Sequence, residues 1–188
     1  MEKNFRQIPS NCKKVVLFGP ESTGKTTLAK QLAAHFKSDW VPEYAREYLQ
    51  QKWDETKEIC TKKDLPIIAA EQMALENQKA STTDTILFCD TDLLVTKIYS
   101  EVYFDGYCDS DLHHFAVNNT YDLYLLLDID TPWVADDLRD KPNERDMMLA
   151  AFKQALHSFK RTFELIQGQG EHRLQAAIQA IQSHFAYV

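Results

Sequence analysis

The stretch VVLFGPESTGKTTLAKQL, residues 15–32, decides the fold of this chain. Its first part, Val15 to Phe18, is a run of β-branched and aromatic residues that a Gly-Pro pair ends, which predicts a short buried strand. Beyond the second glycine the apolar residues recur every four positions, at Leu28, Leu32 and Phe36, and this spacing predicts a helix. The stretch therefore predicts a strand, a loop and a helix in direct succession.

The loop between them, GPESTGKT, fits the phosphate-binding pattern G-x-x-x-x-G-K-[ST]. Its glycines allow the backbone to fold so that N–H groups and the positive end of the helix face phosphate oxygens. Lys25 would reach the β and γ phosphates, and the Thr26 hydroxyl would be a ligand of Mg²⁺. A chance turn with an exposed lysine is the alternative, but the flanking strand and helix argue against it. We expect the nucleotide to contact Gly19, Glu21, Ser22, Thr23, Gly24, Lys25, Thr26 and Thr27.

Strand and helix patterns alternate along the rest of the chain. Four further strand candidates lie at residues 38–42, 85–89, 123–127 and 162–166, with helical stretches between and after them. This alternation predicts an α/β protein with a mainly parallel five-stranded sheet between two helical layers, a P-loop NTPase of nucleoside- or nucleotide-kinase type. We expect a single domain, residues 1–188, with a polar N-terminal extension at 1–12 and a lid at about 128–147.

The composition limits the partners of the protein. The formal net charge of −7, from 21 basic and 28 acidic side chains, argues against nucleic-acid binding, which needs a basic face. The apolar runs fall far short of the roughly 20 residues of a membrane span. Four cysteines without a C-x-x-C pair favour reduced thiols and a cytoplasmic location. Homo-oligomerisation stays open.

The class of NTPase follows from what surrounds the loop. Thr61 to Asp64 (TKKD) resembles the base-reading motif of GTPases, but it precedes the third strand and no D-x-x-G switch is present, so we interpret it as a charged run ending in a helix cap. Motor and remodelling ATPases carry additional domains. The length of 188 residues favours a small-molecule kinase with ATP and Mg²⁺ as cofactors and a nucleoside as substrate.

Two aspartates follow the third strand candidate. Asp90 directly follows the apolar run ILFC, at the carboxyl end of a buried strand, where open α/β sheets bind ligands. We assign it to the magnesium ion or its waters. Asp92 has two interpretations, a substrate-binding carboxylate or the cap of the helix that begins at Leu93.

The segment WVPEYAREY follows the second strand candidate. Glu43 there could accept the proton of an acceptor hydroxyl. Tyr44 and Tyr48 share one helical face, and Arg46 lies beside them, so we expect these residues to line a substrate pocket. The alternative is a surface helix on which Arg46 pairs with nearby acids.

Two later segments complete the predicted site. Arg139 and Arg145 lie in the charged insert at 128–147 and could close on the triphosphate, although the insert could equally be a solvated loop. Gly168 lies in a glycine-rich turn that offers backbone contacts to a purine. The histidines lack the spacing of a structural zinc site.

Taken in order, the motifs GPESTGKTTLAKQLA, PEYAREY, CDTD, YDLYLLLDIDTPWVADDLRD with the following Arg145, and IQGQGEHR resemble the nicotinamide riboside kinase domain of the NadR type, from about Lys14 to Ile181. The resemblance implies ATP-dependent phosphorylation of the ribose 5′-hydroxyl of nicotinamide riboside, with tyrosine faces available to the cationic ring. It also implies that the adenylyltransferase and repressor portions found upstream in such proteins have no room here, so we expect the mononucleotide as the product.

The resemblance leaves roles and alternatives open. By analogy with nucleoside kinases we expect Glu43 as general base and Asp90 as magnesium partner, and the reverse assignment stays open. The alternative functions are a kinase for another nucleoside or small metabolite, and a regulatory ATP-binding module that acts on a partner through residues 103–120.

Overall fold

Five parallel strands form the centre of the computed structural model, which describes residues 4–138 and 143–185. Their order across the sheet is β2-β3-β1-β4-β5, and every neighbouring pair is parallel. The strands are β1 (Lys13–Phe18), β2 (Asp39–Val41), β3 (Ile86–Asp90), β4 (Leu123–Leu127) and β5 (Phe163–Ile166). The helices are α1 (Lys25–Phe36), α2 (Tyr44–Thr56), α3 (Leu65–Ala80), α4 (Leu93–Tyr103), α5 (Ser110–Asn118), α6 (Arg145–Ser158) and α7 (Gly170–His184). The predicted α/β class and strand number are confirmed.

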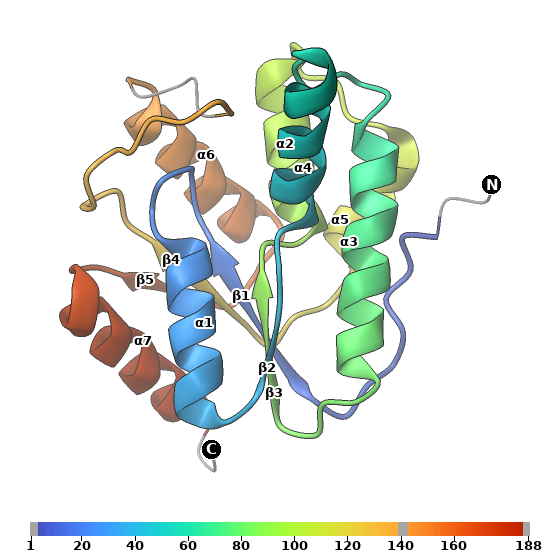
Figure 1. Cartoon of the computed structure of the whole chain (residues 1–188). Helices are drawn as coiled ribbons and strands as arrows, with labels where there is room; N and C mark the ends of the chain where they lie inside the picture. Colours follow the sequence, from blue (N-terminus) through green and yellow to red (C-terminus); the bar gives the residue numbers. More distant parts are fainter. Residues whose placement is uncertain (1–3, 139–142, 186–188) are drawn as a thin grey trace.

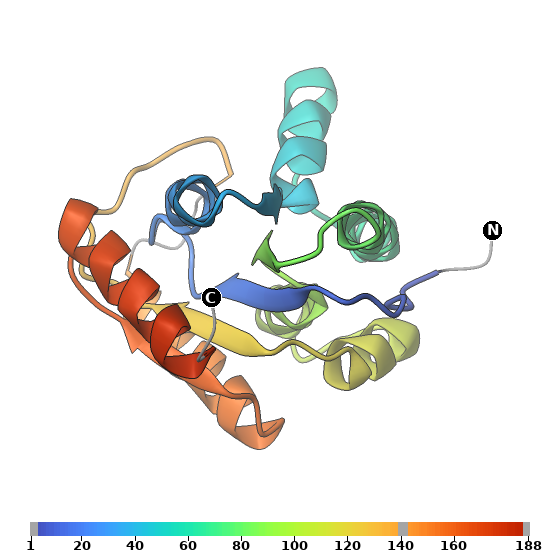
Figure 2. The ribbon, with the colours of Figure 1, turned by 90° about the horizontal axis from the view of Figure 1, so that it is seen from below.

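Helices cover both faces of the sheet (Figures 1 and 2). On one face, α1 and α7 pack against the strand residues that point toward them, such as Val15 and Leu125. On the other face, α4 and α6 pack against the alternate residues of the same strands. Burial on both faces explains why β1, β3 and β4 are nearly continuous apolar runs.

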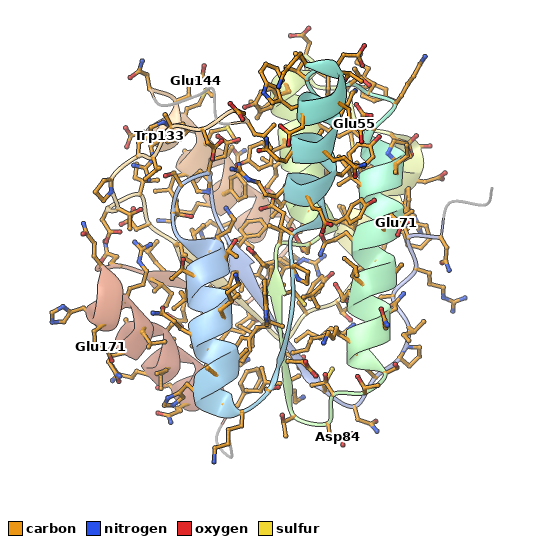
Figure 3. The ribbon with its side chains drawn as sticks, in the orientation of Figure 1. Glu55, Glu71, Asp84, Trp133, Glu144 and Glu171 are labelled. Atoms are coloured by element: carbon orange, nitrogen blue, oxygen red, sulfur yellow. The ribbon has the colours of Figure 1, made fainter. Side chains whose placement is uncertain are left out.

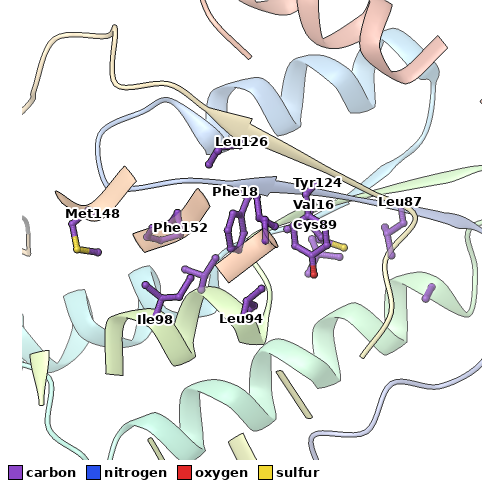
Figure 4. Packing of buried hydrophobic residues seen from close by; sticks show 14 of the residues in the cluster. Val16, Phe18, Leu87, Cys89, Leu94, Ile98, Tyr124, Leu126, Met148 and Phe152 are labelled. Atoms are coloured by element: carbon purple, nitrogen blue, oxygen red, sulfur yellow. The ribbon is translucent and has the colours of Figure 1, made fainter. Parts of the chain in front are cut away.

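Aromatic rings hold the α4 and α6 side of the core together (Figure 4). The ring of Phe18 at the end of β1 meets Tyr124 edge-on at 5.2 Å between centroids and Phe152 of α6 at 4.8 Å. Such pairs contribute about 0.5–1.5 kcal/mol beyond the area that they bury. The residue that leads into the phosphate-binding loop is therefore fixed by packing on a rigid element.

The order of the strands places the functional end of the sheet. From β1 the chain passes to β2 and β3 on one side and then to β4 and β5 on the other. Ligands of open α/β sheets bind at the carboxyl ends of the strands, where connections leave in opposite directions. The loop after β1, which rises above α1 at that end of the sheet in Figure 1, lies at this position.

The N-terminal segment packs onto the domain along its described part. Phe5 is fully buried with Met73 of α3 and Leu112 of α5, and its ring meets Phe115 edge-on at 6.0 Å. This burial was not evident from the polar composition of residues 1–12. Among the described helices, none combines the length and apolar character needed to cross a membrane.

Candidate active site

The loop after β1 has the geometry of a phosphate-binding loop. Gly19 has φ 138°, and a Cβ atom there would lie 3.0 Å from the carbonyl oxygen of Leu127, so only glycine fits beside β4. Gly24 has φ 82° directly before α1. The two glycines of the pattern therefore occupy positions where the backbone has a positive φ, which favours glycine.

Lys25 begins α1 and is only 9% exposed. Its Nζ donates hydrogen bonds to the carbonyl oxygens of Gly19 at 2.9 Å and Pro20 at 2.8 Å, across the loop. The hydroxyl of Thr23 also donates to the Pro20 carbonyl, at 2.9 Å. The lysine charge is therefore held within the loop, next to the backbone that would surround a phosphate.

Thr26, in the first turn of α1, meets Asp90, the last residue of β3. The Thr26 hydroxyl donates to Oδ2 of Asp90 at 2.5 Å. Asp90 is fully buried, and its Oδ1 has no hydrogen-bond partner among the described residues. Burial raises the pKa of Asp90, while the charges of Lys25 and Lys30 and the Thr26 hydrogen bond oppose that rise. A buried, unpartnered carboxylate oxygen beside a hydroxyl fits the oxygen ligands that Mg²⁺ prefers.

Asp92 caps α4. Its Oδ1 accepts a hydrogen bond from the backbone N–H of Val95 at 3.1 Å, and its Oδ2 accepts one from the Tyr124 hydroxyl at 2.7 Å. The side chain is 1% exposed, and burial raises its pKa to about 6. The structure therefore shows the capping alternative and places this carboxylate in the interior.

The insert after β4 lies against the phosphate-binding loop. Ser22 accepts a hydrogen bond from the Thr131 hydroxyl on its carbonyl oxygen and one from the Val134 N–H on its hydroxyl, both at 2.9 Å. Arg145 donates to the carbonyl oxygens of Thr131 at 2.8 Å and Ser22 at 3.2 Å. Arg145, the first residue of α6, thus contacts the phosphate-binding loop, and its role in a lid stays a prediction. Arg139 lies outside the described residues.

The residues predicted from WVPEYAREY lie in two different surroundings: Glu43 lies near Tyr99, and the two tyrosines stack on each other on α2. Glu43 precedes α2, and its negative charge, with that of Glu21, adds to burial in raising the pKa of Tyr99. Glu43 and Glu21 of the phosphate-binding loop therefore both lie near Tyr99. In contrast, Tyr44 stacks on Tyr48 with 6.0 Å between ring centroids.

Polar contacts hold the outer part of α2. The Tyr48 hydroxyl donates to Asp64 at 2.9 Å, and Lys52 pairs with the same carboxylate at 2.8 Å. Arg46 forms a two-point ion pair with Asp136 of the insert. Thr61 also bonds to Asp64, so this part of the TKKD segment joins α2 to α3. This ion pair is the contact of the alternative interpretation, a surface helix on which Arg46 pairs with an acid, and the expected place of Arg46 in a substrate pocket stays a prediction.

A small pocket adjoins the phosphate-binding loop. It is lined by Pro20, Glu21, Tyr99, Tyr103, Trp133, Arg145 and Met148. Trp133 lies at the opposite end of the sheet from Asp84, which precedes β3 (Figure 3). Its three aromatic residues were not predicted from the sequence. The available signals were the i, i+4 spacing of the two tyrosines on α4 and the tryptophan in a charged insert.

Gly168 and Arg173 form the last part of the site. Gly168 has φ 92°, and its N–H donates to Oδ2 of Asp130 at 2.5 Å. Arg173 of α7, 4% exposed, donates to the carbonyl oxygens of Gly168 and Thr23. Arg173 was missed because an arginine in an amphipathic helix has no sequence signal of burial, although it ends the quoted IQGQGEHR motif.

The sheet order and the loop geometry define the class of protein, a P-loop nucleotide-binding protein. The chain belongs to the AAA domain family, whose model matches residues 14–173. Two curated relatives, the trifunctional NAD biosynthesis/regulator proteins NadR of Salmonella typhimurium and Escherichia coli, are each 30% identical over 125 residues, 66% of this chain. That match spans only 30% of the length of each relative.

Solved structures share the fold over almost the whole chain. NadR protein in complex with NR superposes with a TM-score of 0.78 at 22% identity, covering 95% of this chain and 53% of the other. NadR protein with NAD and AMP-PNP gives 0.74 at 20% identity, covering 95% and 51%. Thymidylate kinase from Ehrlichia chaffeensis gives 0.61 at 14% identity, covering 93% and 99%. The predicted kinase-like fold is confirmed.

Proposed function

We propose that this protein is an ATP-dependent kinase that phosphorylates the ribose 5′-hydroxyl of nicotinamide riboside. The 5′-oxygen would attack the γ-phosphorus, its proton would pass to a carboxylate, and ADP and nicotinamide mononucleotide would leave. Support comes from the match to proteins of NAD biosynthesis and from the likeness to a structure that holds NR. A role in NAD biosynthesis would follow.

The observation that carries this proposal is the aromatic pocket beside the phosphate-binding loop. Tyr99, Tyr103 and Trp133 line it together with Glu21. The Arg145 guanidinium lies 5.8 Å from the centroid of the Trp133 ring, so a cationic ligand ring would take its place there. Aromatic faces attract a planar cationic ring, and the attraction strengthens where water is excluded. A pyridinium nucleoside therefore suits this pocket better than the Tyr44–Tyr48 pair, whose outer ring is tied to Asp64.

The nucleotide would occupy the other side of the loop. Lys25 and Arg145 supply positive charge where a triphosphate would lie, and guanidinium forks match phosphate oxygens. Thr26 and Asp90 would hold Mg²⁺, which when bound neutralises phosphate charge. Glu43 would accept the proton of the acceptor hydroxyl, since Asp90 is buried next to Thr26 and suits the metal.

The deciding experiment is coupled ADP release by the purified protein with ATP, Mg²⁺ and nicotinamide riboside, beside a panel of common nucleosides, with product masses determined. We expect release and a mononucleotide mass with nicotinamide riboside. If the protein prefers another nucleoside, the proposed kinase chemistry stands and the proposed acceptor is wrong.

Binding of ATP without acceptor-dependent release would contradict the proposal. A nucleotide-dependent regulatory module would then be the better account. If acceptor-dependent release is observed, the Trp133→Ala variant tests the pocket. Loss of the pocket ring should raise the KM for the nucleoside in a kinase and leave the affinity for ATP unchanged.

A further inference from the structure

Arg173 is a buried cation next to the phosphate-binding loop, and it donates hydrogen bonds to three backbone carbonyl oxygens. Its Nε donates to the Gly168 carbonyl oxygen at 2.7 Å, and its Nη2 donates to the Asp128 carbonyl oxygen at 3.1 Å. Its Nη1 donates to the carbonyl oxygen of Thr23. One guanidinium thus joins the phosphate-binding loop, the end of β4 and the turn before α7.

Asp130 completes this connection from the opposite side. Its Oδ1 pairs with Arg173, and its Oδ2 accepts the N–H of Gly168 at 2.5 Å. Burial lowers the pKa of Arg173, whereas the charges of Asp130 and Asp128 raise it. The carboxylate therefore compensates the buried charge and binds the N–H of Gly168, while Arg173 binds the carbonyl oxygen of the same glycine.

The bond to Thr23 acts on the orientation of the loop. The carbonyl of Thr23 and the N–H of Gly24 belong to one planar trans peptide, so they point in opposite directions. Because Arg173 holds the carbonyl oxygen, the Gly24 N–H is turned away from Arg173. Loop N–H groups are what binds a phosphate, so the orientation of this peptide matters for nucleotide affinity.

We propose that Arg173 is a positioning residue of the nucleotide site, which orients the Thr23–Gly24 peptide and holds the turn at Gly168 in register with it. The inference rests on nucleotide binding within the proposed function and does not require nicotinamide riboside as acceptor. Lysine cannot replace Arg173 in this role, because a single ammonium cannot span three carbonyl oxygens as a planar fork does.

Arg161 provides a matched control. It donates from Nη2 to the carbonyl oxygens of Ala116 at 3.2 Å and Val117 at 2.9 Å, at the end of α5. Like Arg173, it is a shielded arginine that binds backbone carbonyl groups. These bonds lie away from the phosphate-binding loop, so Arg161→Lys measures the effect of losing a guanidinium fork without altering the nucleotide site.

The test measures the dissociation constant of a fluorescent ATP analogue without acceptor, together with the melting temperature, for Arg173→Lys, Asp130→Asn and Arg161→Lys. We expect Arg173→Lys to weaken nucleotide binding by about tenfold or more, Asp130→Asn by a smaller factor, and Arg161→Lys not at all. The melting temperature is expected to fall in both arginine variants.

Equal nucleotide affinity in Arg173→Lys and Arg161→Lys would overturn the inference and leave Arg173 a purely structural residue. If Arg173→Lys does not fold, Asp130→Asn decides the question, and unchanged affinity there counts against the inference. If the wild-type protein binds ATP but does not phosphorylate nicotinamide riboside, the inference about Arg173 stands and the proposed function fails. If it binds no ATP, both the inference and the proposed function fail.

Discussion

At the scale of single residues, Lys25 gives the most direct test of the phosphate-binding loop. Its ammonium group lies within the loop, and we expect Lys25→Ala to lose more than about 1.4 kcal/mol of transition-state stabilisation, at least tenfold in kcat/KM. Steady-state kinetics with the nucleoside acceptor measures this. Lys153→Ala, which removes an exposed lysine from α6, is the control. Turnover near wild type in Lys25→Ala would contradict the loop assignment.

Asp92 makes stability depend on pH in a defined direction. Its pKa is raised from 3.8 to about 6, so the folded state favours the neutral acid. The stabilisation is complete below pH 3.8 and is lost as the pH rises through 6, about 3 kcal/mol in total. Denaturant unfolding should therefore show Asp92→Asn gaining stability relative to wild type between pH 4 and 7.

Asp64 supplies a control of opposite sign for that measurement. Hydrogen bonds from Lys52, Thr61 and Tyr48 outweigh burial and lower its pKa to about 2. Its contribution is present above pH 3.8 and disappears as the pH falls through 2. Asp64→Asn should thus lose stability at neutral pH. The same pH trend in both variants would show that at least one of the two environments does not act as described.

At the scale of elements, α2 differs from the other long helices. It has no buried residue, whereas α1, of nearly equal length, buries five. Polar contacts with Asp64, Gln72 and Asp136 connect it to the rest of the molecule. Elements with few buried apolar contacts open locally at low free-energy cost. We expect amide hydrogens of α2 to exchange faster than those of α1, measured by hydrogen exchange and mass spectrometry.

The matched variant for that experiment is Arg46→Ala, which removes the ion pair between α2 and the insert. We expect faster exchange in α2 and no change in α1, because α1 has no part in this pair. Protection of α2 equal to that of α1 would show that the polar contacts suffice to hold it rigid.

At the scale of the whole molecule, the fold was predictable and half of the site was not. The strand at Leu123–Leu127 could be predicted because burial on both faces makes it a continuous apolar run. The loop from Gly19 could be predicted because its backbone conformation requires glycine at a fixed position. The aromatic pocket is not local, because α4, the insert and α6 meet only after folding. Asp92 shows the same limit, since its sequence position allowed a cap or a ligand and only the position of Tyr124 shows the cap to be buried.

Ligand-dependent stability of the whole domain tests the magnesium site apart from catalysis. ATP at about 100 times its dissociation constant stabilises a protein that binds it by about 2.7 kcal/mol, or about 5–10 °C in Tm for a domain of this size. We expect that shift with Mg²⁺ in the wild type and a smaller one with a chelator. In Asp90→Asn the two shifts should become equal, because the buried carboxylate oxygen beside Thr26 no longer carries charge for the metal. An undiminished Mg²⁺ increment in this variant would place the ion elsewhere and return Asp90 to the role of general base.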